Sequence, residues 1–149
     1  MIFNNIVSHI QMSAINFYKD DLFFFEVRGF SMWPFIKEGK KLIIKKILPQ
    51  ELKIGDIVLY KRDDNLVCHR LVRKSNKCNK YIFYLRGDNS YSQPELISEE
   101  MVLGKAIGVI EHNRIYSLLG NRQIIFSRII VIISPYISRI IRLVKKLLL

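Results

Sequence analysis

Residues 66–89 read LVCHRLVRKSNKCNKYIFYLRGDN. Two runs rich in Val, Leu, Ile, Phe and Tyr, Leu66–Lys74 and Tyr81–Arg86, flank the polar cluster Ser75–Asn79. Runs of this composition are typical of β-strands, and a short polar cluster between two of them is typical of a turn. The stretch therefore predicts an antiparallel hairpin.

The same alternation of apolar runs and turn-forming clusters extends in both directions. Four further runs predict strands: Leu22–Arg28, Lys41–Ile47, Asp56–Lys61 and Met101–His112. Further turn clusters lie at Lys37–Lys40, Asp63–Asn65 and Asp88–Pro94. Gly104 and Gly108, inside the last run, indicate a bend, a bulge or a close backbone approach. We expect a mainly β fold, with a small antiparallel sheet or partly closed β-barrel.

From Ile115 onward the pattern is different. Ser134 followed by Pro135 resembles a helix cap with proline in the first turn, so we expect an amphipathic helix from Tyr136 to Leu149. At about 100° per residue its polar and apolar side chains separate. The polar side holds Ser138, Arg139, Arg142, Lys145 and Lys146, and the apolar side holds Ile137, Ile140, Ile141, Val144 and Leu148. We divide the chain into an N-terminal segment (1–21), a β-rich domain (22–114) and a basic apolar tail (115–149).

The positive charge is concentrated in this tail. The 149 residues include 24 Lys and Arg against 13 Asp and Glu, and residues 113–149 hold seven of the basic residues and no acidic one. A basic segment can bind nucleic acid, but the apolar character of this one favours an anionic membrane surface. We therefore expect no nucleic-acid partner. The alternative is that the apolar face of the helix packs against the chain's own sheet or against a partner.

The sequence predicts no conventional transmembrane segment. The longest uncharged run of the tail, Ile129–Ser138, is shorter than the roughly 20 residues that a membrane span needs. Polar residues interrupt Met1–Tyr18 too often for a span, and it lacks the basic start and apolar core of an export signal. We expect membrane association through the tail, on the cytoplasmic face.

Residues 29–36, GFSMWPFI, place Ser31 on a constrained turn between a glycine and a proline, which would expose its hydroxyl. A serine is a weak nucleophile until a base takes its proton. His69 is the candidate base, because an imidazole that titrates near neutrality can accept a proton and return it. His9, in a polar-interrupted stretch, and His112, in a predicted hairpin turn, have weaker contexts.

A third group that fixes the tautomer of the base improves catalysis, and Asp88 is the candidate. If the hairpin turn is centred between Cys78 and Asn79, Asp88 lies opposite His69. Cys68 is adjacent to His69 in the predicted strand, so its side chain should point to the opposite face of the sheet and take no part.

The remaining titratable residues suggest structural roles. Asp56 follows a glycine before a predicted strand, which is typical of a turn. Cys68 and Cys78 are the only cysteines and form no Cys-x-x-Cys pair, so we expect neither a zinc site nor a disulfide framework. The sequence indicates no metal and no other cofactor.

Four short motifs in order resemble those of the signal peptidase I family. They are Ser31-Met32-Trp33-Pro34, Gly55-Asp56-Ile57-Val58, His69-Arg70 and Gly87-Asp88-Asn89, within residues 29–108. His69 resembles the branch of the family that uses histidine as the base. The resemblance implies a β-rich catalytic fold, a Ser-His pair assisted by an aspartate, and cleavage after small residues in extended peptides.

Two departures from the family pattern concern the site. Many members carry a serine two residues before the nucleophile that helps to stabilise the oxyanion, whereas this chain has Gly29, so the backbone N–H of Ser31 would have to suffice. The second aspartate common in the histidine branch is replaced by Gln93 and Pro94, and Glu95 is the nearest carboxylate. Either Asp88 or Glu95 could orient His69, and we favour Asp88.

The sequence thus predicts a serine endopeptidase that cleaves signal- or leader-peptide-like segments. One alternative is a catalytically inactive module of the same fold that binds a membrane or a partner. Another is a protein that cleaves only itself, as the SOS-type repressors of this broad fold do, but those use lysine where this chain has His69. The Ile-rich and Lys-rich composition suggests a bacterial origin.

Overall fold

The computed structural model of the chain describes residues 15–18, 21–112 and 114–147. The described strands are β1 (Ile15–Tyr18), β2 (Leu22–Glu26), β3 (Lys41–Lys45), β4 (Ile57–Arg62), β5 (Asn65–Lys77), β6 (Lys80–Arg86), β7 (Glu95–Ser98), β8 (Val102–Glu111) and β9 (Arg114–Ser117). Two short 3-10 segments, Pro49–Glu51 and Glu99–Met101, and the helix α2 (Asn121–Leu147) complete the described elements. The expectations for His9 and for most of Met1–Tyr18 lie outside the described residues.

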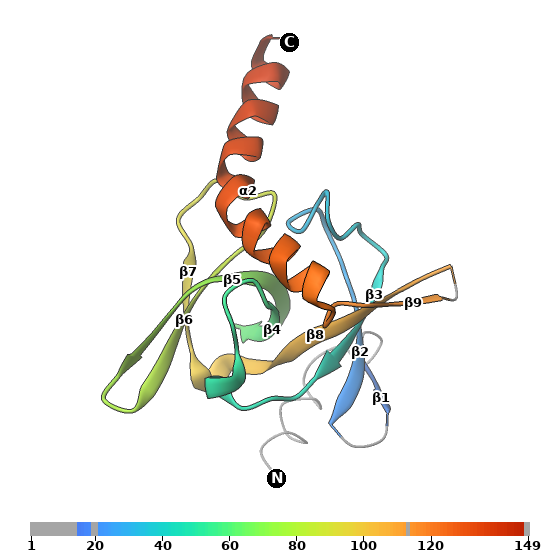
Figure 1. Ribbon diagram of the computed structural model, residues 1–149, viewed down its shortest axis with the longest axis vertical. Helices are drawn as coiled ribbons and strands as arrows, with labels where there is room; N and C mark the ends of the chain where they lie inside the picture. The colour runs from blue at the N-terminus through green and yellow to red at the C-terminus, as the bar shows by residue number, and fades with distance from the viewer. Residues whose placement is uncertain (1–14, 19–20, 113, 148–149) are drawn as a thin grey trace.

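All nine described strands belong to one antiparallel sheet (Figure 1). Its order is β1-β2-β3-β8-β4-β5-β6-β7, and β9 pairs with β8. β1 and β7 are the two ends of this order, so the described sheet is open. The expectation of a mainly β fold with a helical C-terminal segment is confirmed.

The six predicted strands are present within a few residues of their expected bounds, as β2, β3, β4, β5, β6 and β8. The hairpin turn between β5 and β6 lies at Cys78 and Asn79, whose φ angles of 50° and 61° place both in the left-handed region. The sequence did not predict β1, β7 and β9, which are four residues long each. β1 lies before the 22–114 range, whereas β9 begins at its last residue and extends beyond it.

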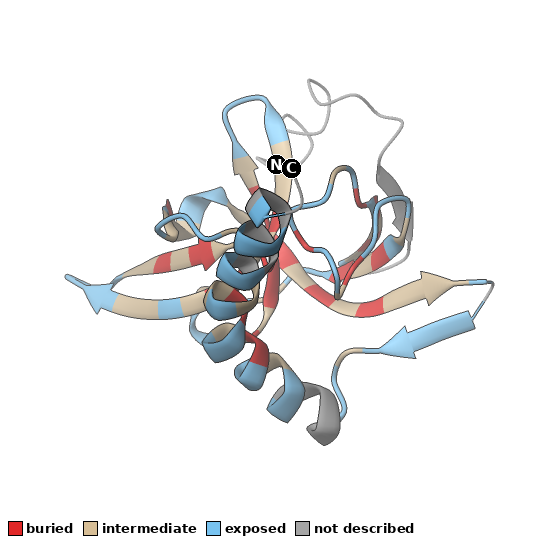
Figure 2. Cartoon of the chain, turned by 90° about the horizontal axis from the view of Figure 1, so that it is seen from above, coloured by how far each residue is buried: buried red, intermediate tan, exposed pale blue. Residues whose placement is uncertain are grey.

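The strands contribute two groups of buried apolar side chains, and Figure 2 shows buried stretches on several of these strands. The first core is formed mainly by β2, β3 and β8 and by the segment after β2, and includes Met32 and Ile36. The second core is formed mainly by β4, β5, β6 and β7, and includes Tyr60 and Phe83. The segments that carry Ser31 and His69 are therefore each anchored in a packed core.

Gly104 permits the close pairing of β8 with β3, as its place inside a strand suggested. A Cβ atom at residue 104 would lie only 2.6 Å from the carbonyl oxygen of Lys45. The register also shifts on both sides of β8, between Ile43 and Ile44 of β3 and between Leu59 and Tyr60 of β4. These bulges bend the sheet around its cores.

The C-terminal helix differs from the prediction. α2 begins at Asn121 and runs through Pro135, whereas a helix from Tyr136 with Ser134 as its cap was expected. Pro135 has no N–H to donate to the carbonyl of Val131, four residues earlier. Arg86 of β6 compensates, because its Nη2 donates to the Val131 oxygen at 3.3 Å and to the Ser134 hydroxyl at 3.2 Å. The helix changes direction near its middle (Figure 1), as prolines commonly cause.

The described part of the chain has no helix of the length and apolar content that crossing a bilayer requires.

Candidate active site

Ser31 lies on an exposed turn between β2 and β3, and buried side chains of the same turn anchor it in the first core. Met32 and Ile36 are only 1% and 4% exposed and fix the turn to the first core. Gly29 has a φ of 78°, a left-handed conformation that favours glycine, and its N–H donates to Oε1 of Glu38 at 2.9 Å. The turn thus presents the Ser31 side chain to solvent from a fixed backbone.

Gly87 brings Ser31 and His69 to the same place. A Cβ atom built on Gly87 would lie 2.6 Å from the carbonyl oxygen of Ser31, 3.1 Å from its Cβ and 3.3 Å from Nε2 of His69. The neighbouring Asn89 donates its backbone N–H to the Ser31 carbonyl oxygen at 2.8 Å. Only a residue without a side chain fits between the serine and the imidazole.

The other nitrogen of the imidazole contacts a tyrosine. His69 pairs with Val58 of β4, and Tyr60, two residues further along β4, lies on the same face. The Tyr60 hydroxyl is 3.0 Å from Nδ1 of His69 and donates to Oε2 of Glu95 at 2.7 Å. Because the hydroxyl proton points to Glu95, its oxygen accepts the Nδ1 proton of His69. This tautomer leaves the lone pair on Nε2, the ring nitrogen that lies beside Gly87.

The protonation states agree with this arrangement. Burial lowers the pKa of His69 to about 4, the Glu95 carboxylate opposes this shift, and Arg62 adds to it. Burial, followed by the hydrogen bond to Glu95 and its charge, raises the pKa of Tyr60 well above its usual range. Near neutral pH the imidazole is therefore neutral and able to accept a proton, while the phenol remains protonated.

Asp88 has a different partner from the one expected. Its two carboxylate oxygens accept hydrogen bonds from Nε and Nη2 of Arg70, each at 2.7 Å, and both residues are almost completely buried. Arg70 also donates to the Gly55 carbonyl oxygen at 2.9 Å. The geometry thus favours a structural role for this carboxylate, and its orientation of His69 stays a prediction.

A β-bulge accounts for this difference. Leu71 pairs with Leu85 and Arg73 with Tyr84, so Val72 is an extra residue in β5. Beyond the bulge Arg70 pairs with Arg86. A shift of one residue exchanges the faces of a strand, so Asp88, two residues after Arg86, falls on the face of Arg70 and not on that of His69.

The rejected nucleophile and base candidates lie elsewhere. Cys68 is buried in the first core, where burial raises the pKa of its thiol well above the usual value, so it stays protonated. His112 lies in the turn between β8 and β9, with a φ of 47° and an exposed side chain.

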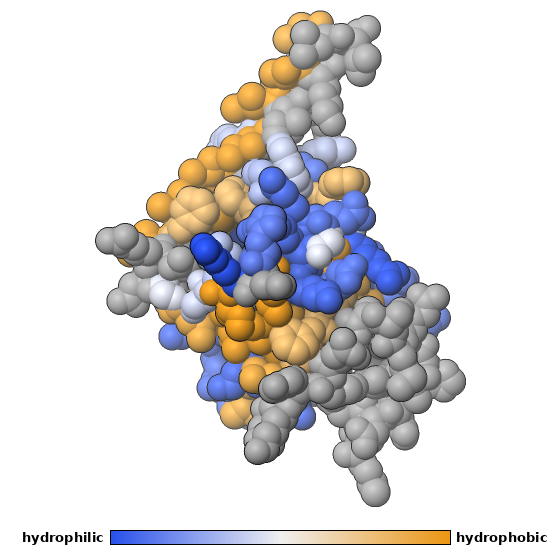
Figure 3. Space-filling view, turned by 90° about the vertical axis from the view of Figure 1, so that its right-hand side faces the viewer, coloured by the Kyte–Doolittle hydropathy of each residue, from blue (hydrophilic) through white to orange (hydrophobic). Residues whose placement is uncertain are grey.

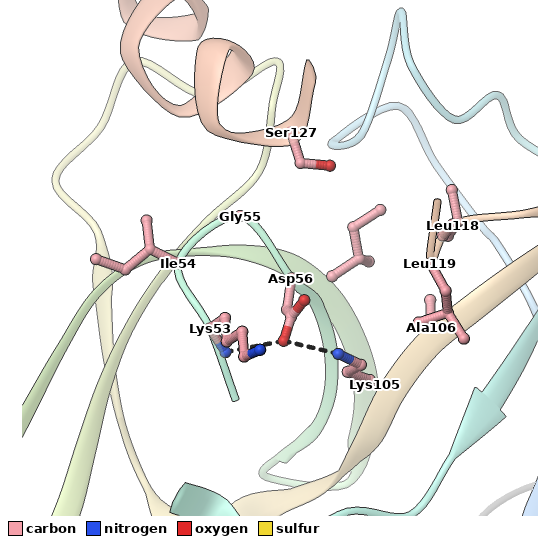
Figure 4. A pocket seen from close by; sticks show the side chains of 10 residues that line it. Lys53, Ile54, Gly55, Asp56, Lys105, Ala106, Leu118, Leu119 and Ser127 are labelled. Atoms are coloured by element: carbon pink, nitrogen blue, oxygen red, sulfur yellow. Dashed lines mark hydrogen bonds and ion pairs between the residues drawn. The ribbon is translucent and has the colours of Figure 1, made fainter. Parts of the chain in front are cut away.

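Asp56 closes a turn beside a separate hollow (Figure 4). Its Oδ2 accepts from the Lys53 backbone N–H at 2.9 Å and from Nζ of Lys105 at 3.1 Å. The hollow of about 190 Å³ is also lined by Gly55 and by Ser127 of α2. The paired charges agree with the structural role expected for Asp56. Among the described residues, no three His, Cys, Asp or Glu side chains are grouped as metal ligands.

α2 contacts the Ser31 turn and the end of β6, which directly precedes Gly87. Its Phe126 ring meets Phe35 of the Ser31 turn edge to face, with ring centroids 5.8 Å apart. Its Ser134 accepts a hydrogen bond from Arg86, which immediately precedes Gly87. The first half of the helix therefore braces the two segments that meet at the site.

Two residues of the site were not recognised in the sequence. Tyr60 could have been found from the pairing of β4 with β5, because it lies two residues from the partner of His69. Arg70 is part of the His69-Arg70 motif, but its pairing with Asp88 depends on the bulge at Val72, which has no clear signal in the sequence.

The family model described as Peptidase S24-like matches residues 2–107 of the chain. This range contains Ser31, His69, Asp88 and Glu95. No curated protein matches the chain significantly. No solved structure does so either.

Proposed function

The chain belongs to the Peptidase S24-like family, and we propose that it is a serine endopeptidase with Ser31 as nucleophile and His69 as general base. The observation that carries the proposal is the position of Gly87, whose missing side chain lets the Ser31 Cβ and the His69 Nε2 approach the same point. The neutral imidazole of His69, with its lone pair on the Nε2 atom beside Gly87, supports the proposal.

The proposed reaction has two steps. Ser31 Oγ attacks the carbonyl carbon of the scissile bond while His69 Nε2 takes the hydroxyl proton, and the resulting imidazolium protonates the leaving amine. Water then attacks the acyl-enzyme while losing a proton to Nε2, and the imidazolium returns that proton to Ser31 Oγ as the acyl C–O bond breaks. The backbone N–H of Ser31 is the proposed donor to the oxyanion.

Tyr60 and Glu95 orient the base in this proposal. The Tyr60 oxygen accepts the Nδ1 proton of His69 at 3.0 Å, which holds the productive tautomer. Glu95 holds the Tyr60 hydroxyl at 2.7 Å and stabilises the imidazolium through its negative charge. Glu95, the alternative acid in the sequence, thereby acts through a tyrosine, while Asp88 stabilises the fold through Arg70.

The proposed substrates are extended signal- or leader-peptide-like segments. This assignment rests on the four motifs shared with signal peptidase I, since the family match itself names no substrate. The mechanism requires an extended backbone at an exposed serine, and the Ser31 turn provides that exposure.

The experiment is to incubate the chain with a peptide pool that includes signal and leader sequences, and to map the cuts by mass spectrometry. Ser31→Ala and His69→Gln should abolish the cuts, while His112→Gln, a substitution of an exposed histidine, should leave them unchanged. Cuts that persist in folded Ser31→Ala would refute the proposal. Cleavage of the chain itself, at a rate that does not change when the protein is diluted, would instead identify a self-cleaving protein.

A catalytically inactive module that binds a membrane or a partner is the second candidate, and the exposed apolar side of α2 fits its binding role. Folded wild type that leaves the whole pool intact, while another peptidase cuts it, would support this candidate.

A further inference from the structure

α2 carries an apolar stripe that faces away from the sheet. The stripe consists of Ile125, Ile129, Ile132, Tyr136, Ile140, Leu143 and Leu147, which are between 42% and 84% exposed. Their spacing of three and four residues places them on one side of the helix over its whole described length. Figure 3 shows hydrophobic side chains along one side of the helix, and Figure 2 shows most of its surface as exposed.

A different side of α2 packs against the body of the protein. Ile130 and Ser134 are 4% and 3% exposed, and Arg86 of β6 donates to the Ser134 hydroxyl. The exposed stripe is therefore not needed for attachment of the helix to the sheet. Seven large apolar side chains remain available along a single surface, which is typical of an interaction site.

Positive charge borders this stripe. Arg128 and Arg139 are both exposed. Arg128 lies four residues before Ile132, and Arg139 lies four residues before Leu143, so each is next to the stripe on the helix surface. α2 contains six Lys and Arg residues and no acidic one.

We propose that the apolar stripe of α2 docks on an anionic lipid bilayer, with the helix lying in the plane of the headgroups. An apolar side bordered by cations fits acyl chains and anionic headgroups at the same time. A second copy of the helix would bring only like charges together beside the stripe. A nucleic acid would leave the apolar side chains in water. Docking uses none of the catalytic groups, so it goes beyond the proposed peptidase function.

The test is sedimentation of the full-length chain with vesicles. Vesicles of phosphatidylcholine with phosphatidylglycerol should bind it, and vesicles of phosphatidylcholine alone should bind at least 10-fold more weakly. Arg128→Gln with Arg139→Gln should weaken binding by about 5-fold per residue. Raising the salt from about 0.05 to 0.5 M should also weaken binding.

The apolar contribution is tested by combining Ile132→Gln, Tyr136→Gln and Leu143→Gln, which replace exposed side chains and keep helix propensity. This variant should bind at least 100-fold more weakly. The matched control, Ile115→Gln with Tyr116→Gln, replaces exposed apolar residues of β9 and should bind like wild type. Ser31→Ala should also bind like wild type, which separates docking from peptidase activity.

Three results would overturn the proposal. One is equal binding to neutral and anionic vesicles. The second is binding that the triple α2 variant leaves unchanged although circular dichroism shows it folded. The third is a stable dimer, or tighter binding to duplex DNA than to vesicles, that depends on the same α2 residues.

Discussion

The Tyr60 hydroxyl lies 3.0 Å from Nδ1 of His69 and 2.7 Å from Oε2 of Glu95. A carboxylate thus reaches the imidazole through a phenol, which stays protonated because burial and Glu95 raise its pKa.

Tyr60→Phe removes the acceptor of the Nδ1 proton and leaves that proton buried without a partner. We expect kcat to fall about 10- to 100-fold with little change in KM, since Tyr60 is fully buried and out of reach of a bound peptide. Glu95→Gln should have a smaller effect in the same direction. Steady-state kinetics and nitrogen NMR of the His69 tautomer provide the measurement. Tyr116→Phe, at an exposed tyrosine, is the control, and unchanged kcat in Tyr60→Phe would contradict the proposed role.

Gly87→Ala would place a Cβ 2.6 Å from the backbone oxygen of Ser31, so the serine turn must move. A displacement of this size should lower kcat/KM at least about 100-fold while the fold is retained. Gly39→Ala is the control, since no atom lies within 4 Å of the added Cβ and only the strain of a φ of 78° results. Equal activity of the two variants would show that Gly87 does not position Ser31.

Asp88→Asn leaves the Arg70 guanidinium buried without its counter-charge. The free energy of unfolding should fall by about 3–5 kcal/mol, as for other broken buried ion pairs. Urea unfolding measures this, with Glu100→Gln as the control, because the Lys80–Glu100 pair is exposed and should contribute less than about 1 kcal/mol. A loss of activity without a loss of stability would instead assign Asp88 to the orientation of His69.

The partly buried His69 should make stability depend on pH. Burial lowers its pKa to about 4, whereas in the unfolded chain it titrates near its usual value of about 6.5. Between these pH values the unfolded chain binds the proton more readily than the folded chain. The free energy of unfolding therefore keeps its full value above about pH 6.5 and falls as the pH is lowered toward 4. The contribution is on the order of 3 kcal/mol. Unfolding measured across this range should show a smaller slope in His69→Gln and an unchanged one in His112→Gln, and equal slopes in both would contradict this assignment.

The sequence was sufficient for most of the fold, because runs such as Leu66–Lys74 and Tyr81–Arg86 combine strand composition with clear turns. Helix α2 was predicted too short because Pro135 normally ends or begins a helix. The structure continues through it because Arg86, distant in sequence, donates to the carbonyl that Pro135 leaves unpaired.

The site was only partly accessible from the sequence. Ser31 and His69 belong to recognisable motifs, and Gly87 brings them together. The partner of His69 was not predictable, because the extra residue Val72 in β5 moves Asp88 to the opposite face. The residue that the structure places at Nδ1 of the imidazole is Tyr60, which the strand pattern alone did not single out.

The most direct test of the central claim is labelling with a fluorophosphonate, which reacts with an activated serine whatever the natural substrate is. The account predicts a single adduct on Ser31, found by peptide mapping, and a labelling rate lowered about 100- to 10,000-fold in His69→Gln. An adduct on another residue, or an unchanged labelling rate without the imidazole, would contradict the assignment of Ser31 and His69 as a catalytic pair.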